Sequence, residues 1–222
     1  LNSIGLIMQD IVSAFNYGKL NKEYLKSSEK SIMNQLQFMS QTIDGFRNFF
    51  TNEQQKTSCD LSVIIEDIRQ LNYAQLTTYG ISLEVDFKNQ MSESTKKDPF
   101  VLMSYSAEIK QIFLNLIANA KDAIIDASLP PSERVIFVSV IAFDHIIRID
   151  VIDHAGGIKA EIADRIFEPY FTTKELGTGL GLYIAKTLCE QYLEGSLFYQ
   201  NDPLKGWSTF RMVLPCTLQE QS

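Results

Sequence analysis

Residues 106–127, SAEIKQIFLNLIANAKDAIIDA, decide the fold. Apolar residues recur in this stretch at steps of three and four, which is typical of the buried face of a long helix. These residues are Ile109, Ile112, Phe113, Leu116, Ile117, Ala120 and Ile124. Three polar residues, Asn115, Asn119 and Asp122, are four and three positions apart, so they share a helix face. Their oxygen atoms suit a Mg²⁺ ion that also contacts phosphates, although a helix with a solvated polar face is the plainer interpretation.

Three later segments carry groups suited to a nucleotide. Residues 153–158, DHAGGI, follow a β-rich run, and a carboxylate fixed there can accept a hydrogen bond from an exocyclic amine such as that of adenine. Residues 167–174, FEPYFTTK, supply aromatic rings, hydroxyls and one cation. Residues 177–182, GTGLGL, run into a predicted helix, where free backbone N–H groups and the helix N-terminus favour phosphate. Each segment alone also fits an ordinary turn or surface loop.

The glycine-rich run is neither of the two commonest nucleotide fingerprints. It does not match G-x-G-x-x-G within a βαβ unit, and it lacks the Gly-Lys-Ser/Thr of a Walker loop. The order and spacing of all four segments therefore carry more information than any one of them.

The chain is predicted to begin with an antiparallel helical hairpin over residues 1–52. Apolar residues recur at helical spacing on both sides of Gly18, which interrupts the pattern. In the second arm the apolar steps alternate four and three, as in a coiled-coil seam. The seam residues are Ile32, Leu36, Met39, Ile43, Phe46 and Phe50. We expect two copies to pair as a four-helix bundle; packing of the hairpin on the downstream domain is the alternative.

Polar residues 53–59 are predicted to be a linker, and residues 60–218 an α+β domain. Asp60 precedes an apolar-periodic stretch and is expected to cap a helix that continues to Leu76. Strands are predicted at 81–87, 100–103, 134–142, 146–152, 195–200 and 207–214, and helices at 106–127 and 179–192. Because helices and antiparallel strands alternate in blocks, we predict a two-layer sandwich with the helices on one sheet face.

Composition excludes several functions. With 20 basic and 27 acidic residues the net charge is −7, which argues against a nucleic-acid surface. The three scattered cysteines indicate free thiols in a reducing compartment. No apolar run is long enough to span a bilayer, so we expect a cytoplasmic location without direct membrane contact, and leave open a membrane-anchored parent. The start at Leu1, in mid-pattern, indicates a piece of a longer protein.

Together the four segments closely resemble the ATPase domain of sensor histidine kinases, of the GHKL type, over about residues 60–218. That family calls them the N box, the first glycine box, the F box and the second glycine box. The resemblance implies ATP and Mg²⁺ as cofactors, with Asn119 as metal ligand and Asp153 as the adenine acceptor. The other implied nucleotide-binding residues are Asn115, Asp122, Gly157, Ile158, Thr173, Lys174, Gly177, Thr178, Gly179, Leu180, Gly181, Leu182 and Ser208.

The sequence departs from the family pattern in two places. Ala155 and His154 stand where the family usually has Gly and Asn, and an alanine adopts positive φ less freely, so the local turn is expected to differ. The opening LNSIG resembles the residues that follow the family's phosphoacceptor box, yet residues 1–52 contain no histidine. As given, the chain is therefore expected not to phosphorylate itself at the family's site.

The resemblance implies a homodimeric protein-histidine kinase. It would transfer the γ-phosphoryl of ATP to a histidine outside these residues, and from there to an aspartate of a response regulator. Amides, one lysine, glycine backbone and a metal fit phosphoryl transfer, which depends mainly on positioning and charge neutralisation. Two alternatives stay open: a serine kinase of the anti-sigma type, and a non-catalytic dimerisation and nucleotide-sensing module. Topoisomerase, mismatch-repair and chaperone ATPases rank lower, because they usually have longer lids and further domains.

Overall fold

The computed structural model describes residues 2–29, 31–33, 55–92, 98–174, 177–202 and 206–216. The chain divides into two compact units, Leu1–Gln54 and Gln55–Ser222, called here the hairpin unit and the sandwich unit. None of the helices within the described ranges is long and apolar enough to cross a membrane.

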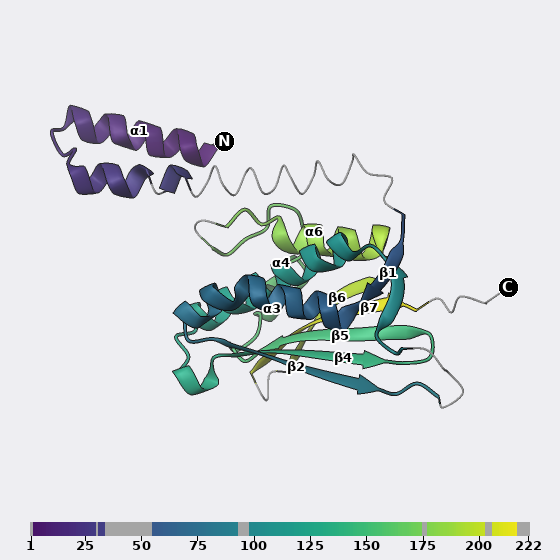
Figure 1. The fold of residues 1–222 in the computed structure, drawn as a ribbon. Helices are drawn as coiled ribbons and strands as arrows, with labels where there is room; N and C mark the ends of the chain where they lie inside the picture. Colours follow the sequence, from purple (N-terminus) through teal and green to yellow (C-terminus); the bar gives the residue numbers. More distant parts are fainter. Residues whose placement is uncertain are drawn as a thin grey trace. The chain divides into compact units, whose positions relative to one another are not determined.

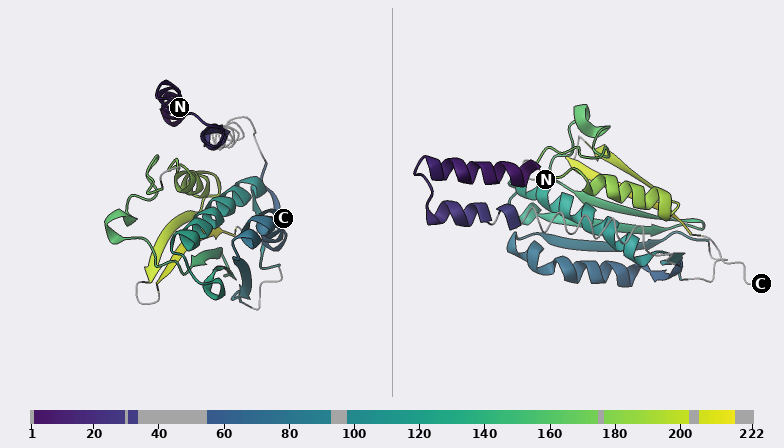
Figure 2. Two further views of the ribbon diagram at one scale, coloured as in Figure 1. Left: turned by 90° about the vertical axis from the view of Figure 1, so that its left-hand side faces the viewer. Right: turned by 90° about the horizontal axis from the view of Figure 1, so that it is seen from above.

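The hairpin unit contains two helical arms that lie side by side (Figures 1 and 2). Helix α1 spans Asn2–Asn16, and Gly18 follows with a φ of 66° that reverses the chain. The second arm is helical over 22–29 and 31–33, and the Asn21 side chain caps it by accepting from Tyr24 N at 2.8 Å. The Tyr24 hydroxyl also donates to Asp10, which ties the arms together. Over residues 2–29 and 31–33 the two predicted arms are helical; seam residues Leu36, Met39, Ile43, Phe46 and Phe50 lie outside the described residues.

The sandwich unit is built on a five-stranded sheet. In spatial order the strands are β2 (Ser82–Asn89), β4 (Val135–Ala142), β5 (Ile146–Asp153), β7 (Trp207–Pro215) and β6 (Ser196–Asp202). Strand β2 pairs with β4 in parallel, and the remaining pairs are antiparallel. The edge at β2 therefore differs from the antiparallel arrangement expected. The chain between β2 and β4 crosses over through a helix, and such a connection favours parallel strands.

Helices cover one face of this sheet (Figure 1). They are α3 (Leu61–Thr78), α4 (Ser106–Asp126) and α6 (Gly181–Thr187), which continues as the π-helical turn η2 (Leu188–Tyr192). All seven residues of the predicted α4 stripe are buried, and fully burying each large aliphatic side chain contributes about 1.5–3 kcal/mol. Asp60 caps α3 as predicted, since its carboxylate accepts from Ser62 N at 2.8 Å. This core places α4 against β4, β5 and α6.

A second, two-stranded sheet leads into α4. Strand β1 (Thr57–Asp60) pairs antiparallel with β3 (Val101–Ser104), which immediately precedes that helix. Part of the predicted 53–59 linker is therefore a strand. Cys59 is 2% exposed, and its burial explains why a polar-looking segment joins the sandwich. Two short helices, η1 (Pro131–Glu133) and α5 (Ala160–Ala163), complete the unit, and neither was predicted.

Candidate nucleotide-binding site

Asp153 is a buried carboxylate at the last position of β5. Its Oδ1 accepts from Ala155 N at 3.0 Å, and Ser208, opposite it in β7, also hydrogen-bonds to it. Burial raises the pKa of Asp153, and the bonds from Ala155 and Ser208 offset part of that rise. Desolvated and oriented in this way, the carboxylate is suited to accept a hydrogen bond from a ligand amine.

Two glycines form the turn that follows Asp153. Gly156 and Gly157 have φ values of 91° and 79°, a region that side chains disfavour. A Cβ on Gly157 would also lie 2.2 Å from Asn201 Oδ1. Among the described non-glycine residues, positive φ occurs only at Ser128, Tyr170 and Glu194. Ala155 therefore has a negative φ, so the turn does not require the positive φ that an alanine adopts less freely.

Residues of β6 and β7 that the sequence analysis missed complete this end of the sheet. The Tyr199 hydroxyl accepts from Ile158 N at 2.7 Å, and Asn201 Nδ2 donates to Ile158 O at 3.5 Å. The His154 ring stacks on Trp207, with centroids 4.7 Å apart. Alternation along β6 puts Tyr199 and Asn201 on one face, but only the sheet register brings them to the turn.

The polar face of α4 holds an unpaired donor. Asn115 Nδ2 is buried and has no hydrogen-bond partner among the described residues. A Cβ on Gly181 would lie 3.6 Å from Asn115 Oδ1, so the start of α6 lies directly against this amide. A buried donor without an acceptor is costly, and a phosphate oxygen of a bound nucleotide would satisfy it. Asn119, one turn further along α4, is half-buried.

The loop before α6 is shaped by close backbone contacts. Gly179 has a φ of 68°, and a Cβ on it would lie 2.3 Å from the carbonyl carbon of Tyr170. A Cβ on Gly177 would lie 2.3 Å from Thr172 Oγ1. Phe167 anchors the preceding segment by packing edge-on against Phe210, at 6.3 Å between centroids. Gly179 is therefore a position where only glycine fits, and a side chain at Gly177 would displace Thr172.

Lys174 binds a residue of α4. Its Nζ lies 2.6 Å from Asp122 Oδ2, and Lys121 Nζ lies 3.3 Å from the other carboxylate oxygen. Both Lys174 and Asp122 were predicted to face a nucleotide, but their binding to each other was not anticipated. Thr173 is exposed, and Thr178, Leu180 and Leu182 are partly exposed.

The predicted residues form two contact groups within the sandwich unit. One joins α4 to the loop before α6, through Asn115 with Gly181 and Asp122 with Lys174. The other joins the end of β5 to β6 and β7 around Asp153. Packing of α4 against β5 and α6 links the two groups.

The donor set limits how a metal ion could be held. Across the part of the chain that the structure describes, no group of three or more His, Cys, Asp or Glu side chains is arranged for a metal. A single amide oxygen, that of Asn119, fits an ion whose other ligands are phosphates and water. The residues present therefore suit Mg²⁺ carried by a nucleotide rather than a metal bound by protein alone.

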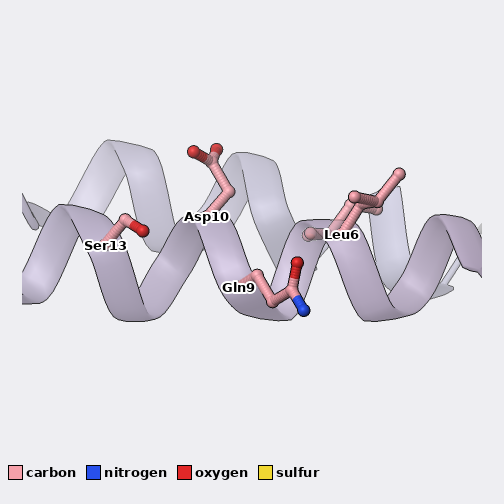
Figure 3. A pocket seen from close by; sticks show the side chains of 5 residues that line it. Leu6, Gln9, Asp10 and Ser13 are labelled. Carbon is pink, nitrogen blue, oxygen red and sulfur yellow. The ribbon is translucent and has the colours of Figure 1, made fainter.

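A shallow hollow lies on the hairpin unit (Figure 3). Leu6, Ile7, Gln9, Asp10 and Ser13, all on α1, line it. None of the predicted nucleotide residues belongs to this group, and the hollow offers neither glycine backbone nor a cation.

Comparison with known proteins identifies the class. Residues 105–218 match the family described as histidine kinase-, DNA gyrase B- and HSP90-like ATPases. The chain belongs to this family, and its sandwich unit is an ATPase domain of the histidine kinase type.

Particular relatives are named as kinases. Sensor histidine kinase ZraS of Klebsiella oxytoca is 38% identical over 165 residues, 74% of this chain and 32% of the relative. Sporulation kinase A of Bacillus subtilis is 28% identical over 160 residues, 72% of this chain and 24% of the relative. The chain thus spans about a quarter to a third of the length of these relatives. Histidine kinase ThkA, solved with the response regulator protein TrrA, shares the fold, with a TM-score of 0.66 at 19% identity over 99% of this chain and 60% of that one.

Proposed function

We propose that this protein is the ATP-binding catalytic portion of a two-component sensor histidine kinase. It binds ATP with Mg²⁺ and transfers the γ-phosphoryl group to a histidine, from which an aspartate of a response regulator receives it. The observation that carries the proposal is the buried, unpaired Nδ2 of Asn115 beside the glycine loop. An acceptor-rich ligand at that position removes a cost that the free protein bears.

Each group of the site has a role in this proposal. Asp153 accepts from the adenine amine, while Gly157 leaves room for the ring. Asn115, Lys174 and the backbone of 177–182 hold phosphates, and Asn119 ligates Mg²⁺. Bound Mg²⁺ neutralises charge on the phosphate oxygens. Because phosphoryl transfer needs mainly positioning and charge neutralisation, no nucleophilic side chain is required of this unit.

The chain organisation is part of the proposal. Residues 1–52 form a dimerisation and phosphotransfer hairpin, 53–59 connect it, and 60–218 form the catalytic domain. Exposed apolar side chains on α1 support pairing of two copies, since a bundle would cover them. They are Leu6, Met8, Val12 and Phe15, exposed by 65, 51, 55 and 68%. The response regulator partner is inferred from ThkA, which was solved with one, and the proposed location is the cytoplasm.

Calorimetric titration tests nucleotide binding. We expect ATP to bind more tightly with Mg²⁺ than with a chelator, and Asp153→Asn to weaken binding about 10- to 150-fold, the value of one hydrogen bond to a charged group. Asp202→Asn is the matched control, because it makes the same change on another strand of the sheet. Undetectable binding at millimolar ATP with Mg²⁺ would refute the proposal.

Phosphoamino-acid analysis tests the reaction itself. The 222 residues contain two histidines, His145 and His154. For the experiment, a segment containing the acceptor box His-x-x-Arg-Gln-Pro is therefore added by gene fusion ahead of Leu1. Incubation with labelled ATP should give acid-labile, base-stable phosphohistidine on that box, and about 10- to 150-fold less of it in the Asp153→Asn variant at ATP concentrations below saturation. Acid-stable phosphoserine on an added partner would favour the serine kinase. Tight binding without any transfer would favour the sensing module.

A further inference from the structure

Asp122 is shared by two lysines. Lys174 Nζ lies 2.6 Å from Oδ2, and Lys121 Nζ lies 3.3 Å from Oδ1. The Asp122 and Lys174 side chains are 37 and 38% exposed, whereas that of Lys121 is 14% exposed. The carboxylate therefore has one accessible cation partner and one largely buried partner.

The backbone holds Lys174 in place for this contact. Thr172 Oγ1 accepts from Lys174 N at 3.1 Å, and Gly177 N donates to Lys174 O at 3.1 Å. Both peptide groups of Lys174 are thus fixed. The lysine side chain spans from this turn to α4, and can change partners without a change in its own backbone.

We propose that Asp122 is a positioning residue that binds the Lys174 ammonium in the free protein and exchanges it with the phosphates of an incoming nucleotide. The inference rests on the proposed function. An ammonium carries no acceptor and donates through three hydrogens, so phosphate oxygens and the Asp122 carboxylate are competing partners. Because the ion pair is more than one third exposed, solvent screens it and the exchange is inexpensive.

Lys121 makes the exchange possible. When Lys174 leaves, Asp122 would otherwise be a bare carboxylate close to phosphates, and like charges repel. Lys121 contacts the opposite oxygen of the same carboxylate and, being largely buried, stays with it. The carboxylate remains compensated while the mobile ammonium neutralises the nucleotide.

Titration calorimetry with Mg²⁺–ATP, on the full chain, tests the exchange. Asp122→Asn removes the competitor, so ATP affinity should rise about two- to fivefold, the value of an exposed ion pair. Lys121→Met strengthens the hold of Asp122 on Lys174, so affinity should fall by a similar factor. Asp122→Glu keeps the carboxylate, so its ATP affinity should stay close to that of wild type.

The Lys174→Met background separates exchange from a general effect of charge. There, Asp122→Asn should change ATP affinity by no more than about 1.5-fold, because the exchanged ammonium is gone. Equal or weaker ATP binding by Asp122→Asn, or a gain that persists in Lys174→Met, would overturn the inference and leave the proposed function standing. If wild-type protein binds no ATP, both fail. Unfolding curves of each variant establish that it is folded.

Discussion

Replacing Asn115 by leucine should make the protein more stable and less able to bind nucleotide. Leucine has the same number and branching of heavy atoms as asparagine, but no donor to leave unpaired. Since Asn115 Nδ2 is buried without a partner among the described residues, removing it should recover the desolvation cost of one unsatisfied donor, about 1–3 kcal/mol. In the same variant ATP affinity should fall about 10- to 150-fold, because the lost bond is to a charged phosphate.

Asn72 provides the matched control for this prediction. Its Nδ2 donates to Ile68 O at 2.8 Å on α3, so the same change to leucine breaks an existing hydrogen bond. Asn72→Leu should therefore leave stability unchanged or lower it by up to about 1.5 kcal/mol.

Urea unfolding followed by the fluorescence of Trp207 measures both variants. Trp207 is the single tryptophan of the chain and lies in β7, so it reports on the sandwich unit. A higher unfolding midpoint for Asn115→Leu than for wild type, with an unchanged slope, is the expected result. If Asn115→Leu were no more stable than wild type, Asn115 would not hold an unpaired donor, and the main support for the proposed function would be lost.

Three further predictions concern the glycine loop, a buried thiol and the Asp153 carboxylate. Gly179→Ala should lower the free energy of unfolding by about 2–5 kcal/mol, because the alanine would have both a positive φ and a backbone clash. Gly156→Ala is the control: its Cβ meets no described atom within 4 Å, so its loss should be only about 1–2 kcal/mol. Equal losses in urea unfolding would contradict the clash. Burial raises the pKa of Cys189 to about 12. Iodoacetamide should therefore modify Cys189 only when the protein is unfolded in urea, as mass spectrometry of its peptides would show. Rapid modification of Cys189 in the native protein would contradict this prediction. Burial also raises the pKa of Asp153, so its contribution to stability is full below about pH 4, the unfolded value, and is lost as pH rises through the folded pKa. The stability of wild type relative to Asp153→Asn should therefore fall over that window, and a flat difference would show that the carboxylate is not desolvated.

The spacing of apolar residues was enough to predict the helices that pack against the core of the sandwich unit. Every residue of the predicted α4 stripe is buried, because a helix packed on a sheet must bury one continuous face. The cap at Asp60 was predictable for a similar local reason, since it depends on its own backbone and Ser62 alone.

Features that depend on distant partners were not predictable in the same way. Strand β1 looked like a polar linker, and only pairing with β3 and burial of Cys59 make it a strand. The parallel placement of β2 follows from the path of the crossover, which periodicity does not report.

In the candidate site, too, local features were predictable and contacts between distant residues were not. Glycine positions could be predicted because backbone freedom is a property of the residue itself. The contacts of Tyr199 with Ile158, and of Lys174 with Asp122, join residues 41 and 52 positions apart in the chain. Such pairs depend on register and loop path, so sequence alone supplied the groups but not their partners.

A crystal structure with Mg²⁺ and a non-hydrolysable ATP analogue tests the central claim most directly. We expect the base amine within hydrogen-bond distance of the Asp153 carboxylate, and a phosphate oxygen accepting from Asn115 Nδ2. A nucleotide bound elsewhere, with Asn115 still unpaired and Asp153 still contacting only Ala155 and Ser208, would contradict the account.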